Sequence, residues 1–136
     1  MVNSARILAA AVALIGASPS SAAVVAGVVP VGVWGGDQAI LTVGEDGASL
    51  KTGCAEGHIP GPVRVDRKGR ISAHGTFQSF TPGPQRADEE PGALDAAFTG
   101  RMSGQTLRLT VRASADPAAH SFTLRRDAHP KLIRCL

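Results

Sequence analysis

The side chains that could perform chemistry are few and lie far apart in the sequence. The histidines are His58, His74, His120 and His129. No two of them are separated by the three to five residues that place a pair of metal ligands on one helix or turn. A metal site would have to be assembled from distant segments. We therefore expect scattered surface histidines, with no metal and no other cofactor.

Serines and cysteines are the remaining candidate nucleophiles. Either type needs a positioned base to become reactive, and no serine lies in a G-x-S-x-G turn. Both cysteines of the chain, Cys54 and Cys135, are expected to be joined to each other for the reason given below. We therefore expect no catalytic residue and a protein that is not an enzyme.

Three consecutive acids, Asp88, Glu89 and Glu90, form a cluster of carboxylates. They lie with Arg86 in a long, proline-rich segment, residues 81–92. Neighbouring carboxylates support acid–base catalysis only when burial raises one pKa, so a solvated patch is the favoured interpretation. Because loops of this length often carry function, a binding loop formed by these four charged residues stays open.

The elements that must position these side chains are short β-strands. Apolar and polar residues alternate in segments such as 107–112, where Leu107, Leu109 and Val111 share one face. Similar alternation recurs along the chain, and no long stretch has helical spacing. We predict eight strands, over residues 33–43, 48–54, 62–66, 70–78, 95–101, 105–113, 120–126 and 131–135.

Short turns between these strands predict that neighbours in sequence are neighbours in space. Glycines close the turns at 45–47, 66–69 and 103–104. We predict an all-β fold, a small antiparallel eight-stranded up-and-down barrel, because closure removes both exposed edges. Gly35-Gly36 indicates a bulge or sharp bend inside the first strand, which a barrel needs. A β-sandwich is the alternative, and the barrel interior is either filled or hollow.

The N-terminal segment has the pattern of an export signal. An arginine precedes the apolar run 7–17, and small residues follow it. We predict a signal peptide over residues 1–23 and a single domain over 24–136, with cleavage after Ala23 or, alternatively, Ala26. An uncleaved anchor is a further alternative, although the run is shorter than the about 20 residues that span a bilayer. The mature protein is expected to be secreted or periplasmic and free of the membrane.

The charge of the predicted domain excludes one class of partner. Without Arg6 it has 13 of the 14 Lys and Arg against 11 Asp and Glu, a net charge of about +2. That value and the small number of aromatic residues argue against nucleic acid. Arginines on polar strand faces could bind an anionic partner, but dispersed exterior arginines are the favoured interpretation: Arg64, Arg108, Arg112, Arg125 and Arg126.

Cys54 and Cys135 are expected to form a disulfide, since an exported protein meets an oxidising compartment. The bond would close a loop of roughly 80 residues, for which the chain-entropy relation gives about 4 to 5 kcal/mol as an upper value. Two free thiols are the alternative.

The tryptophan of the chain occurs in the segment Gly32-Val33-Trp34. This segment resembles the Gly-x-Trp signature of the calycin superfamily, which comprises lipocalins, avidins and bacterial metalloprotease inhibitors. The resemblance implies that Trp34 plugs the closed end of a small barrel, with a basic residue from the last strands on its indole. Arg125 and Arg126 are the candidates for that cation–π contact. A tryptophan that serves as a ligand platform is the alternative.

Other segments are similar to a group of small exported bacterial proteins of unassigned function, and this likeness implies no activity. They are Trp34-Gly35-Gly36, Cys54, Gly83-Pro84, Phe122-Thr123-Leu124 and Cys135-Leu136.

We expect a monomeric, non-enzymatic binding protein that takes a small apolar ligand or a secreted protein partner at the barrel mouth. The alternative is an inhibitor of a secreted protease, in which residues 24–31 would be the arm that the resembled inhibitors insert into the protease cleft. A structural protein is the second alternative.

Overall fold

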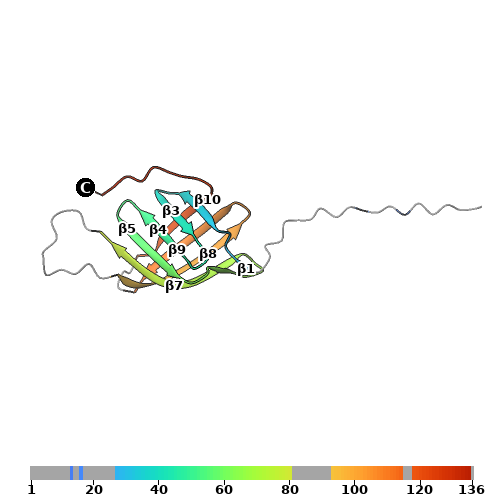
Figure 1. Cartoon of the computed structure of the whole chain (residues 1–136), viewed down its shortest axis with the longest axis horizontal. Helices are drawn as coiled ribbons and strands as arrows, with labels where there is room; N and C mark the ends of the chain where they lie inside the picture. The colour runs from blue at the N-terminus through green and yellow to red at the C-terminus, as the bar shows by residue number, and fades with distance from the viewer. Residues whose placement is uncertain (1–12, 14–15, 17–26, 81–92, 115–117, 136) are drawn as a thin grey trace, which may run out of the picture.

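The computed structural model describes residues 13, 16, 27–80, 93–114 and 118–135, and these form an all-β barrel (Figure 1). Its strands are β1 (Gly27–Val28), β2 (Gly32–Gly36), β3 (Ala39–Val43), β4 (Gly47–Thr52), β5 (Ala55–Pro60), β6 (Arg64–Val65), β7 (Arg70–Ser79), β8 (Leu94–Ser103), β9 (Thr106–Ala113) and β10 (His120–Arg126). The described residues contain no helix of the length and apolarity that a membrane span requires.

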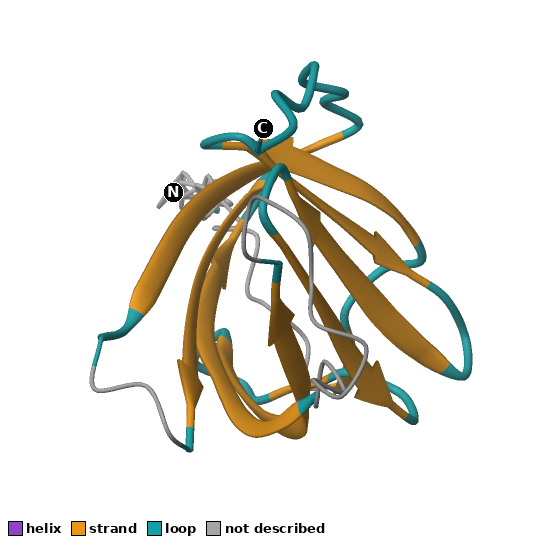
Figure 2. Ribbon diagram, turned by 90° about the vertical axis from the view of Figure 1, so that its left-hand side faces the viewer, coloured by secondary structure: helices purple, strands orange, loops and turns teal. Residues whose placement is uncertain are grey.

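Eight strands form the closed wall of the barrel. Their order is β7-β5-β4-β3-β2-β10-β9-β8, and β8 pairs in turn with β7. Every pair is antiparallel. β6 pairs with the first part of β7, and β1 pairs with β6. The predicted closed, eight-stranded antiparallel barrel is confirmed, and it is seen from one end in Figure 2.

The number of wall strands is right, but three predicted strands differ from the structure. The predicted strand 62–66 is the two-residue β6, which pairs with β7 and is not part of the wall. The segment 33–43 is a hairpin, β2 and β3, because Asp37 and Gln38 have φ values of 50° and 60° and reverse the chain. The segment 131–135 is not a strand. β5 was not predicted, because its inward positions alternate through Ala55, Gly57 and Ile59, a pattern with little apolar contrast.

One end of the barrel, here called the closed end, carries β1 and the turns at 44–46, 66–69 and 104–105. Val29 is 1% exposed there, and its backbone N–H donates to the carbonyl oxygen of Val63 at 2.8 Å. The opposite end, here called the mouth, carries the β2–β3 turn at 37–38 and the β4–β5 turn at 53–54.

Inward-facing apolar side chains fill the barrel from the closed end to its middle. Trp34 and Phe98 are both fully buried. A Cβ built on Gly57 would lie 3.2–3.3 Å from the rings of Phe98 and Phe77, so both rings pack on the bare backbone of β5. The remaining large buried side chains of the core are Val29, Leu41, Leu50, Leu107, Leu109, Val111 and Leu124. The barrel interior between the closed end and the middle is therefore packed, as protein cores generally are.

After β10, residues 127–135 run along the outside of the barrel as an extended segment, here called the strap (Figure 1). Asp127 has φ 60° and turns the chain, and its N–H donates to the Val33 carbonyl oxygen at 2.7 Å. At the other end the Cys135 N–H donates to the Gly53 carbonyl oxygen at 3.2 Å.

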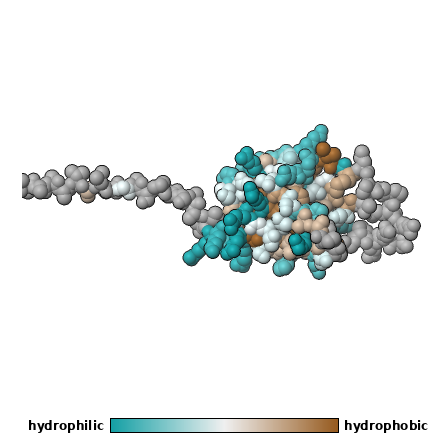
Figure 3. All heavy atoms as spheres, turned by 180° about the vertical axis from the view of Figure 1, so that it is seen from behind, coloured by the Kyte–Doolittle hydropathy of each residue, from teal (hydrophilic) through white to brown (hydrophobic). Residues whose placement is uncertain are grey.

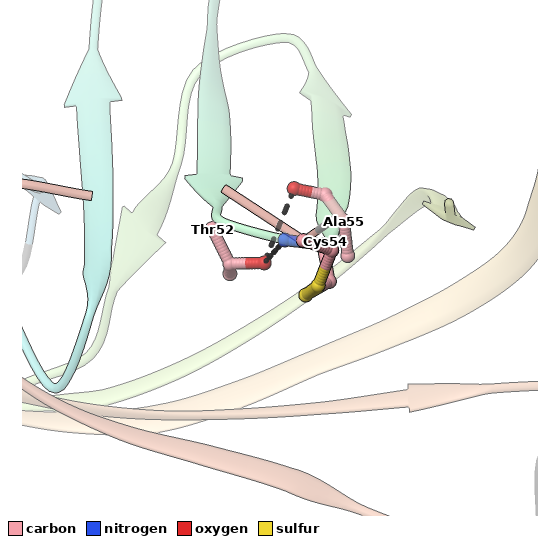
Figure 4. Close-up of a disulfide and its surroundings, with 4 residues drawn as sticks. Thr52, Cys54 and Ala55 are labelled. Atoms are coloured by element: carbon pink, nitrogen blue, oxygen red, sulfur yellow. Dashed lines mark hydrogen bonds between the residues drawn. A yellow bond between two sulfur atoms is a disulfide. The ribbon is translucent and has the colours of Figure 1, made fainter. Parts of the chain in front are cut away.

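The strap is fastened by the disulfide Cys54–Cys135, which joins residues 81 apart in sequence (Figure 4). The Cα atoms of the two cysteines are 5.3 Å apart, within the range that a disulfide requires. The predicted disulfide is confirmed. It ties the β4–β5 turn at the mouth to the last described residue of the chain.

Gly35 lies beneath the strap, where a side chain would have no room. A Cβ there would overlap the Ala128 carbonyl oxygen and the Pro130 ring, and at Gly53 it would overlap the Ile133 carbonyl oxygen. We predicted a bulge or a sharp bend at Gly35-Gly36. There is no bulge, since β2 pairs in continuous register with β3, and the chain bends directly after Gly36, at Asp37 and Gln38. The absent side chain instead lets the strap approach the wall.

We predict that Gly35→Ala destabilises the protein by about 1 to 3 kcal/mol, because the added methyl group displaces the strap from β2. The measurement is urea unfolding followed by tryptophan fluorescence. Gly44→Ala is the matched control: its Cβ would lie 3.5 Å from the Gly47 carbonyl oxygen, an ordinary contact, and its cost should stay within about 0.5 kcal/mol. Equal costs for the two variants would contradict this account of the strap.

The β6–β7 turn is organised by Asp66. Its Oδ1 accepts the backbone N–H groups of Lys68 and Arg70 at 2.8 Å each, and its Oδ2 accepts Nε of Arg70 at 3.2 Å. The Arg70 backbone N–H, the Arg70 side chain and the Lys68 N–H lower the pKa of the Asp66 carboxyl from its ordinary value of 3.8, and partial desolvation opposes them.

We predict a pH-dependent contribution of Asp66 to stability. Because its folded-state pKa is depressed, the contribution is present above the ordinary value of 3.8 and is lost as the pH falls through the folded-state pKa. The pKa can be measured by NMR titration of the carboxyl carbon. Asp66→Asn keeps an acceptor for both backbone N–H groups and should remove this part of the acid dependence of unfolding. An unshifted carboxyl resonance would contradict the prediction.

Candidate functional site at the barrel mouth

The mouth holds a recess, here called the cup, with a volume of about 360 Å³. Four parts of the barrel meet around it: the β2–β3 turn, the β4–β5 turn, the end of β7 and the start of β10, while the strap adds one edge. The lining residues are Asp37, Gln38, Thr52, Gly53, Cys54, Ala55, Phe77, Ser79, Phe80, His120, Phe122 and Ile133.

Aromatic rings form much of the cup. The Phe77 and His120 rings lie with their centroids 5.6 Å apart at an interplanar angle of 32°. Because β8 and β9 separate β7 from β10 in the sheet, this contact crosses the barrel interior. Phe122 is half-buried on the same inward face as Leu124, and Phe80 is 42% exposed at the end of β7. The buried Phe77 ring gives the cup an apolar floor, and the exposed Phe80 ring lies at its rim in contact with solvent.

Polar groups stand at the rim. Oδ2 of Asp37 accepts the backbone N–H of Thr123 at 2.7 Å, which holds the β2–β3 turn against β10. Oγ1 of Thr52 donates to the Ala55 carbonyl oxygen at 3.3 Å and accepts the Cys54 N–H at 3.2 Å, so the β4–β5 turn uses this hydroxyl (Figure 4). Gln38 and Ser79 complete the polar lining.

The strap contributes Ile133, whose side chain is 74% exposed beside the cup. The disulfide next to it anchors this edge of the mouth to the β4–β5 turn. An exposed isoleucine at the edge of an apolar recess extends the surface on which an apolar molecule can be buried.

Comparison with known proteins identifies no relative. No model of a protein family, no curated protein and no solved structure matches the chain. The site is therefore interpreted from its own geometry.

Trp34 is fully buried in the core and does not line the cup. Its Nε1 is buried with no hydrogen-bond partner among the described residues. Arg126 is directly opposite Trp34 in the β2–β10 pairing and is half-buried on the inward face of β10. Arg125 is opposite Gly35 and exposed on the outer face. The register thus brings Arg126, not Arg125, to the position that the resemblance implies, and the plug role of these residues stays a prediction.

The predicted loop residues Arg86, Asp88, Glu89 and Glu90 lie outside the described residues. His58 and His74 are exposed on the outer faces of β5 and β7, and His129 is exposed on the strap. Within the described ranges no three metal-ligating side chains come together.

The residues of the cup were not recognised as a site from the sequence. A usable signal was present: Phe77 falls at the end of one predicted strand and Phe122 at the beginning of another. In an antiparallel barrel with three connections between two such strands, these positions lie at the same end. The presence of aromatic residues at the mouth was therefore predictable from the sequence. The rim was not predictable, because it depends on the path of the strap.

Proposed function

We propose that the protein is a non-enzymatic binding protein that takes a small apolar molecule into the cup. The observation that carries this proposal is an aromatic recess of about 360 Å³ above a packed core. Ligand sites in proteins typically have volumes of about 300 to 1,000 Å³, with mostly apolar walls and a few polar groups. Phe77, Phe80 and Phe122 supply the apolar walls here, and Asp37 and Gln38 can orient a polar end of the ligand.

We also propose that the protein is calycin-like and that it is exported. The calycin-like character is supported by Arg126, which lies directly opposite Trp34, and export is supported by the disulfide at the mouth. Disulfides persist in oxidising compartments, which suits a protein preceded by a signal-like segment.

The protease-inhibitor alternative receives less support from the geometry. The arm expected to enter a protease would include residues 27–31, but Gly27 and Val28 pair with β6 and Val29 is buried. A segment that pairs with β6 and buries Val29 is not a free arm that can enter a cleft. A protein partner at the mouth would use the same aromatic rim as the small ligand.

The test uses N-phenyl-1-naphthylamine, a neutral apolar fluorophore whose emission rises in an apolar site. We predict that the wild-type protein binds it and that Phe122→Ala weakens binding by about tenfold, since burial of one large apolar side chain is worth about 1.5 to 3 kcal/mol. Fluorescence titration gives the dissociation constants.

Met102→Ala is the matched control. Met102 is also a partly buried side chain packed on the core, but it lies on β8 toward the closed end. Its truncation should leave probe binding within about twofold of the wild type. Equal losses in both variants, or no binding by the wild type, would count against the cup. Native mass spectrometry of the protein from its own host would then identify a retained ligand.

A further inference from the structure

Three arginines stand side by side on the outer wall toward the closed end. Arg70 of β7 is directly opposite Arg101 of β8, and Arg101 is directly opposite Arg108 of β9. All three are exposed. Directly opposed residues have Cβ atoms about 4.5 to 5.5 Å apart, so the row crosses three neighbouring strands without interruption. We call this row, with the outward residues next to it, the arginine wall.

Hydroxyl groups form the next row of the arginine wall toward the mouth. The register aligns Ser72, Thr99, Thr110 and Ser121 across β7, β8, β9 and β10. Oγ1 of Thr110 and Oγ of Ser121 are 3.1 Å apart and share a hydrogen bond. The wall therefore offers a line of guanidinium groups beside a line of hydroxyl groups.

The positive charge of this wall is largely uncompensated. Asp66 pairs with Arg70, Oδ2 to Nε at 3.2 Å. Arg101 and Arg108 have no ion pair within the part of the chain that the structure describes. The outward acid on these strands, Asp95, lies opposite Thr76 toward the mouth. Strongly hydrophilic atoms gather toward the left of the barrel in Figure 3, the end that carries β1.

Opposed like charges carry a cost in a sheet. Two arginines directly across a strand pair repel each other and destabilise the pair. The barrel places two such pairs in succession, Arg70 with Arg101 and Arg101 with Arg108. An anion bound between the guanidinium groups would relieve this repulsion, and the relief would contribute to the free energy of binding.

The surface between these side chains is hollowed enough to seat an anionic group. One depression of about 360 Å³ lies between Arg101, Ser103, Thr106 and Arg108. Another, of about 530 Å³, lies between β6, β7 and β8, with Arg64, Arg70 and the Asp66 carboxylate that pairs with Arg70 on its lining. Both depressions reach β8, one from β9 and the other from β6 and β7, so an extended ligand can contact both.

The side chains of the arginine wall favour one class of polyanion over the others. Its outward positions on β7, β8 and β9 hold arginine, serine, threonine, histidine, alanine, glutamine and aspartate, with no large apolar or aromatic side chain among them. Protein interfaces have apolar and aromatic centres, single-stranded nucleic acids stack on aromatic rings, and membrane surfaces reward apolar insertion. Guanidinium forks match carboxylate and sulfate groups, and hydroxyl groups match sugar hydroxyls.

We propose that the arginine wall binds an acidic polysaccharide, with carboxylate or sulfate groups held by Arg70, Arg101 and Arg108 and sugar hydroxyls facing the serine and threonine row. This surface is separate from the cup and requires no ligand there.

The test measures binding of immobilised heparin and of polygalacturonate at low and at physiological ionic strength. Arg101→Gln combined with Arg108→Gln removes two charges from the wall. Lys131→Gln combined with Arg134→Gln, the matched control, removes two exposed charges from the strap. We expect the wall variant to bind at least about tenfold more weakly than the wild type, and the control to stay within about twofold.

A second readout shows whether the wall variant is folded. Because it loses repulsion between opposed arginines, its melting temperature at low salt should equal or exceed that of the wild type. Arg108→Lys, which keeps the charge but loses the planar fork, should also weaken polysaccharide binding.

Three results would overturn the proposal. The first is an equal loss of binding in the wall and strap variants, which would indicate a response to net charge alone. The second is no binding of either polysaccharide at low ionic strength. The third is tighter binding to phosphatidylglycerol vesicles or to duplex DNA than to both polysaccharides, which would assign the wall to another class of polyanion.

Discussion

Replacement of both Cys54 and Cys135 by serine is expected to lower the free energy of unfolding by about 4 kcal/mol. The bond joins residues 81 apart, and the chain-entropy relation for a loop of that length gives roughly 4.5 kcal/mol as an upper value. For a domain of this size the melting temperature should fall by about 10 to 20 °C. Urea unfolding, followed by the fluorescence of Trp34, measures the change.

The disulfide also decides where the strap lies. Apart from this bond, the described end of the strap is held by the hydrogen bond from the Cys135 N–H to the Gly53 carbonyl oxygen. Without the bond, amide hydrogens of the strap should exchange rapidly while those of β9 keep their protection. Reduction of the wild-type protein is the control and should reproduce both effects. A loss of stability below about 1 kcal/mol would show that strap contacts, not the covalent link, hold the strap against the barrel.

The second large effect is expected at Trp34. Trp34→Ala should destabilise the protein by about 3 to 5 kcal/mol, because the indole is fully buried and its removal leaves a cavity. Trp34→Phe should cost much less, within about 1.5 kcal/mol. The phenyl ring keeps most of the apolar volume, and the substitution removes an Nε1–H that has no partner among the described residues. Because both variants lack the fluorophore, unfolding is followed by far-ultraviolet circular dichroism.

A double-mutant cycle with Arg126→Gln tests whether a cation contributes to the plug. If the guanidinium lies on the indole, the coupling energy between positions 34 and 126 should be about 0.5 to 2 kcal/mol. Arg125→Gln is the matched control, since Arg125 is exposed on the outer face of the same strand. Similar coupling at both arginines, or none at either, would remove the cation–π part of the resemblance and leave Trp34 as an ordinary core residue.

Strand boundaries were predicted well where apolar and polar residues alternate strongly. They were predicted poorly where backbone conformation or tertiary contacts determine where a strand begins or ends. The β2–β3 turn was missed because Asp37 and Gln38 both have positive φ, a conformation usually associated with asparagine and glycine in tight hairpins. β5 was missed because Gly57 stands where an inward apolar residue was expected, and the Phe77 and Phe98 rings supply the missing volume. Neither feature has a local signature.

The predicted strand 131–135 shows how the closed topology limits pairing. It does not become a strand, because all eight wall strands already pair on both sides. A closed barrel has no free edge for a further strand. The segment can therefore only lie on the outside, where Gly35 and Gly53 make room for it.

By itself, the sequence determined the all-β class, and it favoured the closed antiparallel barrel over a β-sandwich and a disulfide over two free thiols. Period-two alternation assigns side chains to an inner and an outer face, short glycine turns force antiparallel neighbours, and two cysteines in one chain have a single intramolecular pairing. Only the tertiary structure decided that the Phe77, His120 and Phe122 rings meet in one cup, and that Arg70, Arg101 and Arg108 form one row. Both features join strands distant in sequence through their register, and a shift of one residue would have turned each side chain to the opposite face of the wall.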